Sequence, residues 1–179
     1  MIKIDGNKIL VDTKTQTVLF VDGRLSEIIS KLDGCRYLYD TTAGEVPVSL
    51  VYACDRTLPM GKAEHCRVET IAYSDYMVNL SFGGWNGHAE LLIEEDRQTG
   101  AVCVTPSAHT SRSGVLACRW EIGGLAPDLT MTLPFYQGFQ ARLDDPILNW
   151  EIFRDMRYPY RWEESFAVFG TNMGGMWIW

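Results

Sequence analysis

The chain has 179 residues, 46% of them hydrophobic and 22% charged, proportions that exclude a disordered or collagen-like protein. Sixteen basic residues against 23 acidic ones give a net charge of −7, which argues against a nucleic-acid partner because phosphate binding needs a basic surface. The length favours a single domain over residues 1–179.

The first forty residues contain three tight-turn signals, Asp5-Gly6, Asp22-Gly23 and Asp33-Gly34. They predict short strands joined by hairpins. Residues 25–32 are ambiguous, because their apolar side chains have the i, i+3, i+4, i+7 spacing of a helix but follow directly on a turn. Both a short helix and a strand remain open for this segment.

The dominant period further along the chain is two. Apolar and polar residues alternate in 76–82, 116–122 and 129–133, as expected of strands with one buried and one solvated face. Two hairpins are predicted, one turning at 98–100 and one at 172–175.

About a dozen strand candidates and one short helix after Pro146 predict an all-β fold of two antiparallel sheets packed face to face. The apolar ending 176–179 is expected to pair inside a sheet, with more protein beyond it.

The N-terminus and the cysteines bear on the compartment. Neither a signal peptide nor the ~18 apolar residues of a membrane helix is present. The five cysteines form no CxxC pair and are expected to be reduced and buried, which favours the cytoplasm. No metal or cofactor motif occurs, so no metal and no cofactor are expected. The cysteines are Cys35, Cys54, Cys66, Cys103 and Cys118.

Two segments offer the residue types that contact sugars. In the glycine-rich loop 82–88, Trp85 offers a flat apolar face, and Asn86 and His88 offer hydrogen bonds. The alternative is a hairpin loop whose tryptophan covers a sheet edge. In segment 149–164, Arg161 and Trp162 could line a sugar groove or a domain interface, or simply pin a long connection to the sandwich.

Three stretches carry a family resemblance. Residues 133–138, 158–170 and 174–178 resemble the N-terminal β-super-sandwich of certain predicted glycoside hydrolases, where a Trp-rich connection leads into a strand, a Gly-Gly hairpin and a returning strand. The opening, from Ile9 to Ile28, is similar to the first strands of the galactose-mutarotase-like fold. The resemblance implies a β-super-sandwich followed by a (β/α) barrel that holds the catalytic acids.

We therefore expect a non-catalytic, carbohydrate-associated N-terminal domain of a glycoside hydrolase. Its expected partners are a C-terminal catalytic barrel and an oligo- or polysaccharide. The expected sugar-binding residues are Trp85, Asn86, His88, Arg161 and Trp162.

Two alternatives remain open. One is a small sugar mutarotase or epimerase, with His88 or His109 acting together with a carboxylate such as Glu163 as acid and base. The other is a structural interaction module without a ligand. Whether this chain is itself an enzyme stays open.

Overall fold

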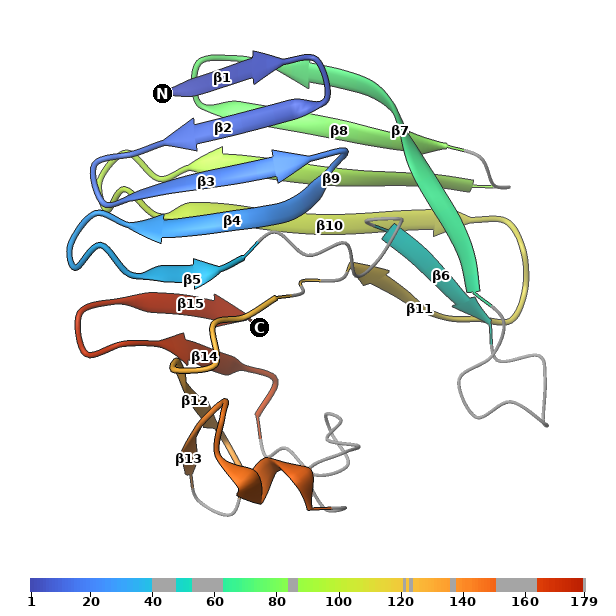
Figure 1. The fold of residues 1–179 in the computed structure, drawn as a ribbon. Helices are drawn as coiled ribbons and strands as arrows, with labels where there is room; N and C mark the ends of the chain where they lie inside the picture. Colours follow the sequence, from blue (N-terminus) through green and yellow to red (C-terminus); the bar gives the residue numbers. More distant parts are fainter. Residues whose placement is uncertain are drawn as a thin grey trace.

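The computed structural model describes residues 1–39, 48–52, 63–83, 87–120, 122, 124–135, 138–150 and 164–178. Their regular structure is almost all β, which confirms the predicted fold class (Figure 1). The short helix expected after Pro146 is one turn of 3-10 helix, η1. In this part of the chain, no helix has the length and hydrophobicity that a membrane crossing requires. The elements are β1 (Ile2–Asp5), β2 (Lys8–Asp12), β3 (Gln16–Val21), β4 (Arg24–Ser30), β5 (Arg36–Leu38), β6 (Val48–Tyr52), β7 (Ala63–Tyr73), β8 (Met77–Gly83), β9 (Gly87–Glu95), β10 (Val102–Thr110), β11 (Val115–Trp120), β12 (Thr130–Leu133), β13 (Phe139–Arg142), η1 (Pro146–Asn149), β14 (Ala167–Gly170) and β15 (Gly175–Ile178).

The first sheet is an antiparallel meander of five strands in the order β1-β2-β3-β4-β5. Its tight turns fall where the Asp-Gly signals predict them. Asp22 and Gly23 have φ values of 52° and 75°, the left-handed pair that a two-residue hairpin turn requires. Asn7 in the neighbouring turn donates a hydrogen bond to the Asp22 carboxylate at 2.8 Å, which ties the two turns together.

The second sheet has six strands in the order β10-β9-β8-β7-β6-β11. Strand β7 is 11 residues long and serves two neighbours, because its first residues pair with β6 and its later ones with β8. In Figure 1 it runs obliquely between β8 on one side and the pair formed by β6 and β11 on the other. The predicted hairpin at 98–100 joins β9 to β10.

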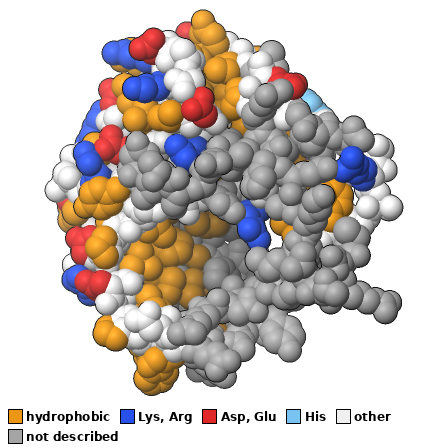
Figure 2. Space-filling view, turned by 45° about the vertical axis from the view of Figure 1, so that its right-hand side comes forward, with side chains coloured by type: hydrophobic (Ala, Val, Ile, Leu, Met, Phe, Trp, Pro, Cys, Tyr) orange, Lys and Arg blue, Asp and Glu red, His pale blue; other side chains and the backbone are white. Residues whose placement is uncertain are grey.

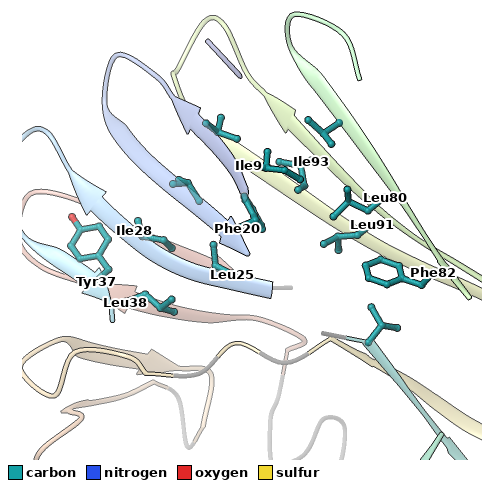
Figure 3. Close-up of a cluster of buried hydrophobic side chains, with 14 of the residues drawn as sticks. Ile9, Phe20, Leu25, Ile28, Tyr37, Leu38, Leu80, Phe82, Leu91 and Ile93 are labelled. Atoms are coloured by element: carbon teal, nitrogen blue, oxygen red, sulfur yellow. The ribbon is translucent and has the colours of Figure 1, made fainter. Parts of the chain in front are cut away.

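The main core lies between these two sheets. Figure 3 shows side chains of β2, β3 and β4 directed at those of β8 and β9. In β8, Val78, Leu80 and Phe82 are at most 2% exposed, as their alternation predicts, and each such buried side chain contributes roughly 1.5–3 kcal/mol. Tyr76 precedes the strand and is exposed. At one end, the Thr13 hydroxyl donates to the Gly100 carbonyl at 2.7 Å and so links turns of the two sheets.

A third sheet, which the sequence did not predict, has four strands in the order β13-β12-β14-β15. Figure 1 places β15 beside β5. Thr171, in the turn between β14 and β15, donates a hydrogen bond to Asp33, in the turn before β5, at 2.8 Å. Phe169 of β14 and Met176 of β15 pack against the main core. The inner face of this sheet buries its own smaller cluster, centred on Leu133, Phe135 and Ala167.

The ambiguous segment 25–32 is a strand over most of its length, because residues 24–30 form β4. The strand interpretation of this segment is therefore correct. Leu25 and Ile28 belong to the main core, whereas Ile29 is half-buried and Leu32, beyond the end of the strand, is 57% exposed.

The expectation of buried cysteines is wrong for the thiols that the structure describes. Cys103 and Cys118 are exposed, and Cys35 is half-buried. Cys103 lies on the edge strand β10 opposite Glu94, on the face turned away from the core, so the apolar neighbours Val102 and Val104 did not indicate its burial. These three thiols are free, as expected.

Candidate functional site

The structure describes one of the five residues expected to bind sugar. Trp85, Asn86, Arg161 and Trp162 lie outside the described residues. Glu163, the carboxylate of the alternative enzyme hypothesis, lies outside them as well.

His88, the remaining one, is the second residue of β9 and is exposed to solvent. Its Nε2 lies 2.8 Å from Glu90 Oε1, and this hydrogen bond lowers the pKa of the Glu90 carboxyl. His109 of β10 stands directly opposite His88 in the antiparallel ladder. Both imidazoles therefore belong to the side of the second sheet that is turned away from the main core. Among the described residues, no three His, Cys, Asp or Glu side chains are grouped so as to hold a metal ion.

A second candidate lies on the third sheet. Its strand register places Trp177 opposite Val168, Val168 opposite Thr132, and Thr132 opposite Gln140. Direct partners in an antiparallel sheet share a face, so these four side chains form one row across all four strands. The Gln140 amide donates a hydrogen bond to the Thr132 hydroxyl at 3.2 Å, which sets the orientation of both polar groups.

The adjacent row consists of Gly175, Gly170, Thr130 and Arg142, which pair in the same way. Both glycines are required by close backbone approach. A Cβ on Gly170 would lie 2.5 Å from the carbonyl oxygen of Gly174, and one on Gly175 would lie 2.5 Å from that of Phe169. The surface beside Trp177 therefore carries no side chain. We call these two rows the outer face; its residues are Trp177, Val168, Thr132, Gln140, Gly175, Gly170, Thr130 and Arg142.

The aromatic member of the outer face is open to solvent and contacts a second aromatic ring. Trp177 is 62% exposed, although it belongs to a paired strand. Phe166 meets its ring edge-to-face, with 6.3 Å between ring centroids and 80° between planes. Such contacts favour one ring orientation. Figure 2 shows hydrophobic side chains gathered in the lower half of the molecule, at the height of the third sheet in Figure 1.

Arg142, on the edge strand opposite the one that carries Trp177, forms an ion pair with Asp144. Its Nε and one terminal nitrogen lie 2.8 Å and 2.6 Å from the two carboxylate oxygens of Asp144. These charge-assisted hydrogen bonds lower the pKa of Asp144 and raise that of Arg142. The pair is bidentate and cancels its own charge.

Sequence reasoning missed the outer face, although each of its strands carries a signal. Thr130 and Thr132 are the polar phase of the alternation in 129–133, and Trp177 is the outward residue of the last predicted hairpin. The missing information is which strands become neighbours. Comparisons with family models, with curated proteins and with solved structures find no match to this chain.

Proposed function

We propose that this chain is a non-catalytic carbohydrate-binding domain, and that the outer face of the third sheet is its binding surface. The observation that carries the proposal is the row formed by Trp177, Val168, Thr132 and Gln140, in which an exposed indole shares one sheet face with a hydroxyl and an amide.

The chemistry of a sugar ring suits this row. A pyranose has C–H patches on its faces and hydroxyl groups around its rim. The indole of Trp177 offers a flat apolar surface for the C–H patch. Its edge-to-face contact with Phe166 favours one indole orientation, so less side-chain entropy is lost when a sugar ring stacks on the indole. Thr132 and Gln140 supply both donors and acceptors for the hydroxyl groups.

The wider setting follows from the resemblance in the sequence. Strand β14 and strand β15, the second of which carries Trp177, fall in the stretches that resemble the N-terminal super-sandwich of predicted glycoside hydrolases. We therefore include in the proposal a galactose-mutarotase-like super-sandwich that supports a C-terminal (β/α) barrel and presents glycan to it. The third sheet, with its solvated outer face, is the part we expect to contact the glycan.

Titration of the protein with cello-, xylo- and manno-oligosaccharides, followed by tryptophan fluorescence and calorimetry, tests the proposal. We expect one of these series to bind, and Trp177→Ala to weaken its binding roughly tenfold or more. Trp150→Ala is the matched control, because Trp150 is 63% exposed but lies outside the four strands of the sheet. Equal binding by wild type and Trp177→Ala would contradict the proposal, as would equal losses in both variants.

One observation favours the mutarotase or epimerase alternative. His88 contacts Glu90 at 2.8 Å and stands opposite His109, so an imidazole and a carboxylate are already within proton-transfer distance on the outer face of the second sheet. Polarimetry of glucose and galactose anomers measures this activity directly. The alternative requires faster interconversion with wild type than with His88→Ala; equal rates would reject it for His88.

A further inference from the structure

We infer that the outer face selects a neutral, linear glycan segment over an acidic one and holds it across the strands, from Trp177 towards Gln140. This inference rests on the proposed function and names the class of ligand that the same surface takes.

The charge of the surface carries the first step. Among the eight residues of the outer face, Arg142 alone has a charged side chain. An acidic sugar would need this guanidinium as its partner, but Asp144 already occupies it through two hydrogen bonds of 2.8 Å and 2.6 Å. A uronate would have to displace a carboxylate held in the same bidentate geometry, so it would gain little from Arg142. The net charge of −7 adds a repulsive background.

The dimensions of the row carry the second step. Its four strands are separated by three spacings of about 4.8 Å each, so the row spans about 14 Å. The indole stands at one end, and the paired Thr132 and Gln140 stand at the other. A single ring stacked on Trp177 could not also reach Gln140. A chain of several sugar units can use both ends, and therefore should bind more tightly than one unit.

The two glycines support the same conclusion. Because Gly170 and Gly175 carry no side chain, neither residue places a side chain between the backbone beside Trp177 and an unbranched chain that lies there. The row contains two apolar and two polar side chains, which suits a chain rich in hydroxyl groups. An apolar partner would cover Thr132 and Gln140 without offering them hydrogen bonds, and this costs free energy.

The test uses the complete chain and two defined probes, cellohexaose as the neutral ligand and hexagalacturonate as the acidic one. We expect cellohexaose, or the neutral hexamer of the series found above, to bind roughly tenfold or more tightly than hexagalacturonate. The neutral affinity should change little with added salt, because no ion pair forms. The neutral monosaccharide should bind more weakly than the hexamer.

Asp144→Asn supplies a gain-of-function arm. Removing the carboxylate releases the Arg142 guanidinium, so the ratio of acidic to neutral affinity should rise roughly tenfold. Asp75→Asn, in the turn between β7 and β8, makes the same change of charge away from the third sheet and should leave the ratio unchanged. Circular dichroism spectra that superimpose on that of the wild type show that both variants fold.

The outcomes separate this inference from the proposed function. If no glycan binds, or if Trp177→Ala has no effect, the proposed function fails and the inference fails with it. If the acidic hexamer binds more tightly than the neutral one and Trp177→Ala abolishes that binding, the proposed function stands and the inference is overturned. A monosaccharide that binds as tightly as the hexamer overturns the extended mode of binding.

Discussion

Gly23 closes the turn between β3 and β4, and its α-carbon faces the opposite sheet. It has a φ of 75°, and a Cβ at this position would lie 2.9 Å from the Phe82 ring and 3.1 Å from a methyl group of Val68. Two separate constraints therefore act on one residue. The left-handed backbone disfavours any other amino acid, and the core leaves no space for a side chain.

We expect Gly23→Ala to destabilise the fold by about 2–4 kcal/mol, the sum of a backbone penalty and an overpacking penalty. Gly6→Ala is the matched control, because Gly6 has a φ of 59° but a methyl group added there would meet no atom within 4 Å. Urea denaturation of both variants measures the difference. A loss of stability in Gly6→Ala as large as that in Gly23→Ala would show that contact with Phe82 is unimportant.

Asp33 makes stability depend on pH. Hydrogen bonds from Ser30, from the backbone N–H of Cys35 and from Thr171 lower the pKa of its carboxyl to about 2. The Thr171 bond, 2.8 Å long, joins the turn after β4 to the β14–β15 hairpin. A carboxyl whose pKa is lowered by folding stabilises the folded state above its unfolded pKa, and this stabilisation is lost as the pH falls through the folded pKa.

We therefore expect wild type to be more stable than Asp33→Asn at neutral pH, with the difference shrinking between about pH 4 and about pH 2. Urea denaturation across this range measures it. If the gap between wild type and Asp33→Asn stays constant down to the lowest pH, the carboxylate does not make these bonds in the folded protein.

At the level of single elements, β4 explains why its sequence resembles a helix. The ladder between β3 and β4 shifts register between Leu19 and Phe20, a β-bulge that places one extra residue in β4. Both Leu25 and Ile28 therefore reach the core, although they are three residues apart. A spacing of three is also the signature of a helix face, so periodicity alone could not decide between the two.

The strands of the third sheet show the other limit of sequence analysis. The alternation in β12 and the Gly-Gly hairpin between β14 and β15 could be predicted from local pattern. The pairing of β12 with β14 could not, because it depends on packing between segments 36 residues apart in register, from Thr132 to Val168. The outer face exists only through that pairing, so no local motif indicates it.

The β14–β15 hairpin makes a prediction of its own. Gly175→Ala would place a methyl group 2.5 Å from the Phe169 carbonyl and 3.0 Å from the Gly170 α-carbon, so the two strands would have to separate. We expect a loss of about 1–3 kcal/mol and a weaker near-UV dichroism signal from Trp177. Gly174→Ala, whose methyl group would meet only the Tyr37 hydroxyl at 3.2 Å, should lose less. Equal losses would contradict the backbone clash.

At the scale of the whole molecule, the third sheet is joined to the sandwich rather than appended to it. In the segment that leads into β12, Leu125 forms a β-bridge with Leu38 and the Ala126 N–H donates to the Tyr37 carbonyl at 3.0 Å; Met176 of β15 packs against the main core. The all-β sandwich class was predicted correctly from the sequence, but the third sheet was not, since its strands have the same period of two as the others.

We expect one cooperative unfolding transition, in which far-UV dichroism and tryptophan fluorescence change together. Leu91→Ala, at a position that is fully buried in the main core, should destabilise the protein by about 2–5 kcal/mol and lower both midpoints equally. If the fluorescence and dichroism changes occur at different urea concentrations, the protein does not unfold as one cooperative unit.

Strand β7 ties distant parts of the second sheet into one backbone. Its residues 63–66 pair with β6, and its residues from 67 onward pair with β8. The β6–β11 corner is therefore connected to the centre of the sandwich through one continuous strand. Amide protons in the β7–β8 ladder should therefore be among the slowest to exchange with deuterium. The β6–β11 corner thus shares one continuous strand with the β7–β8 ladder, whose β8 side chains lie in the main core.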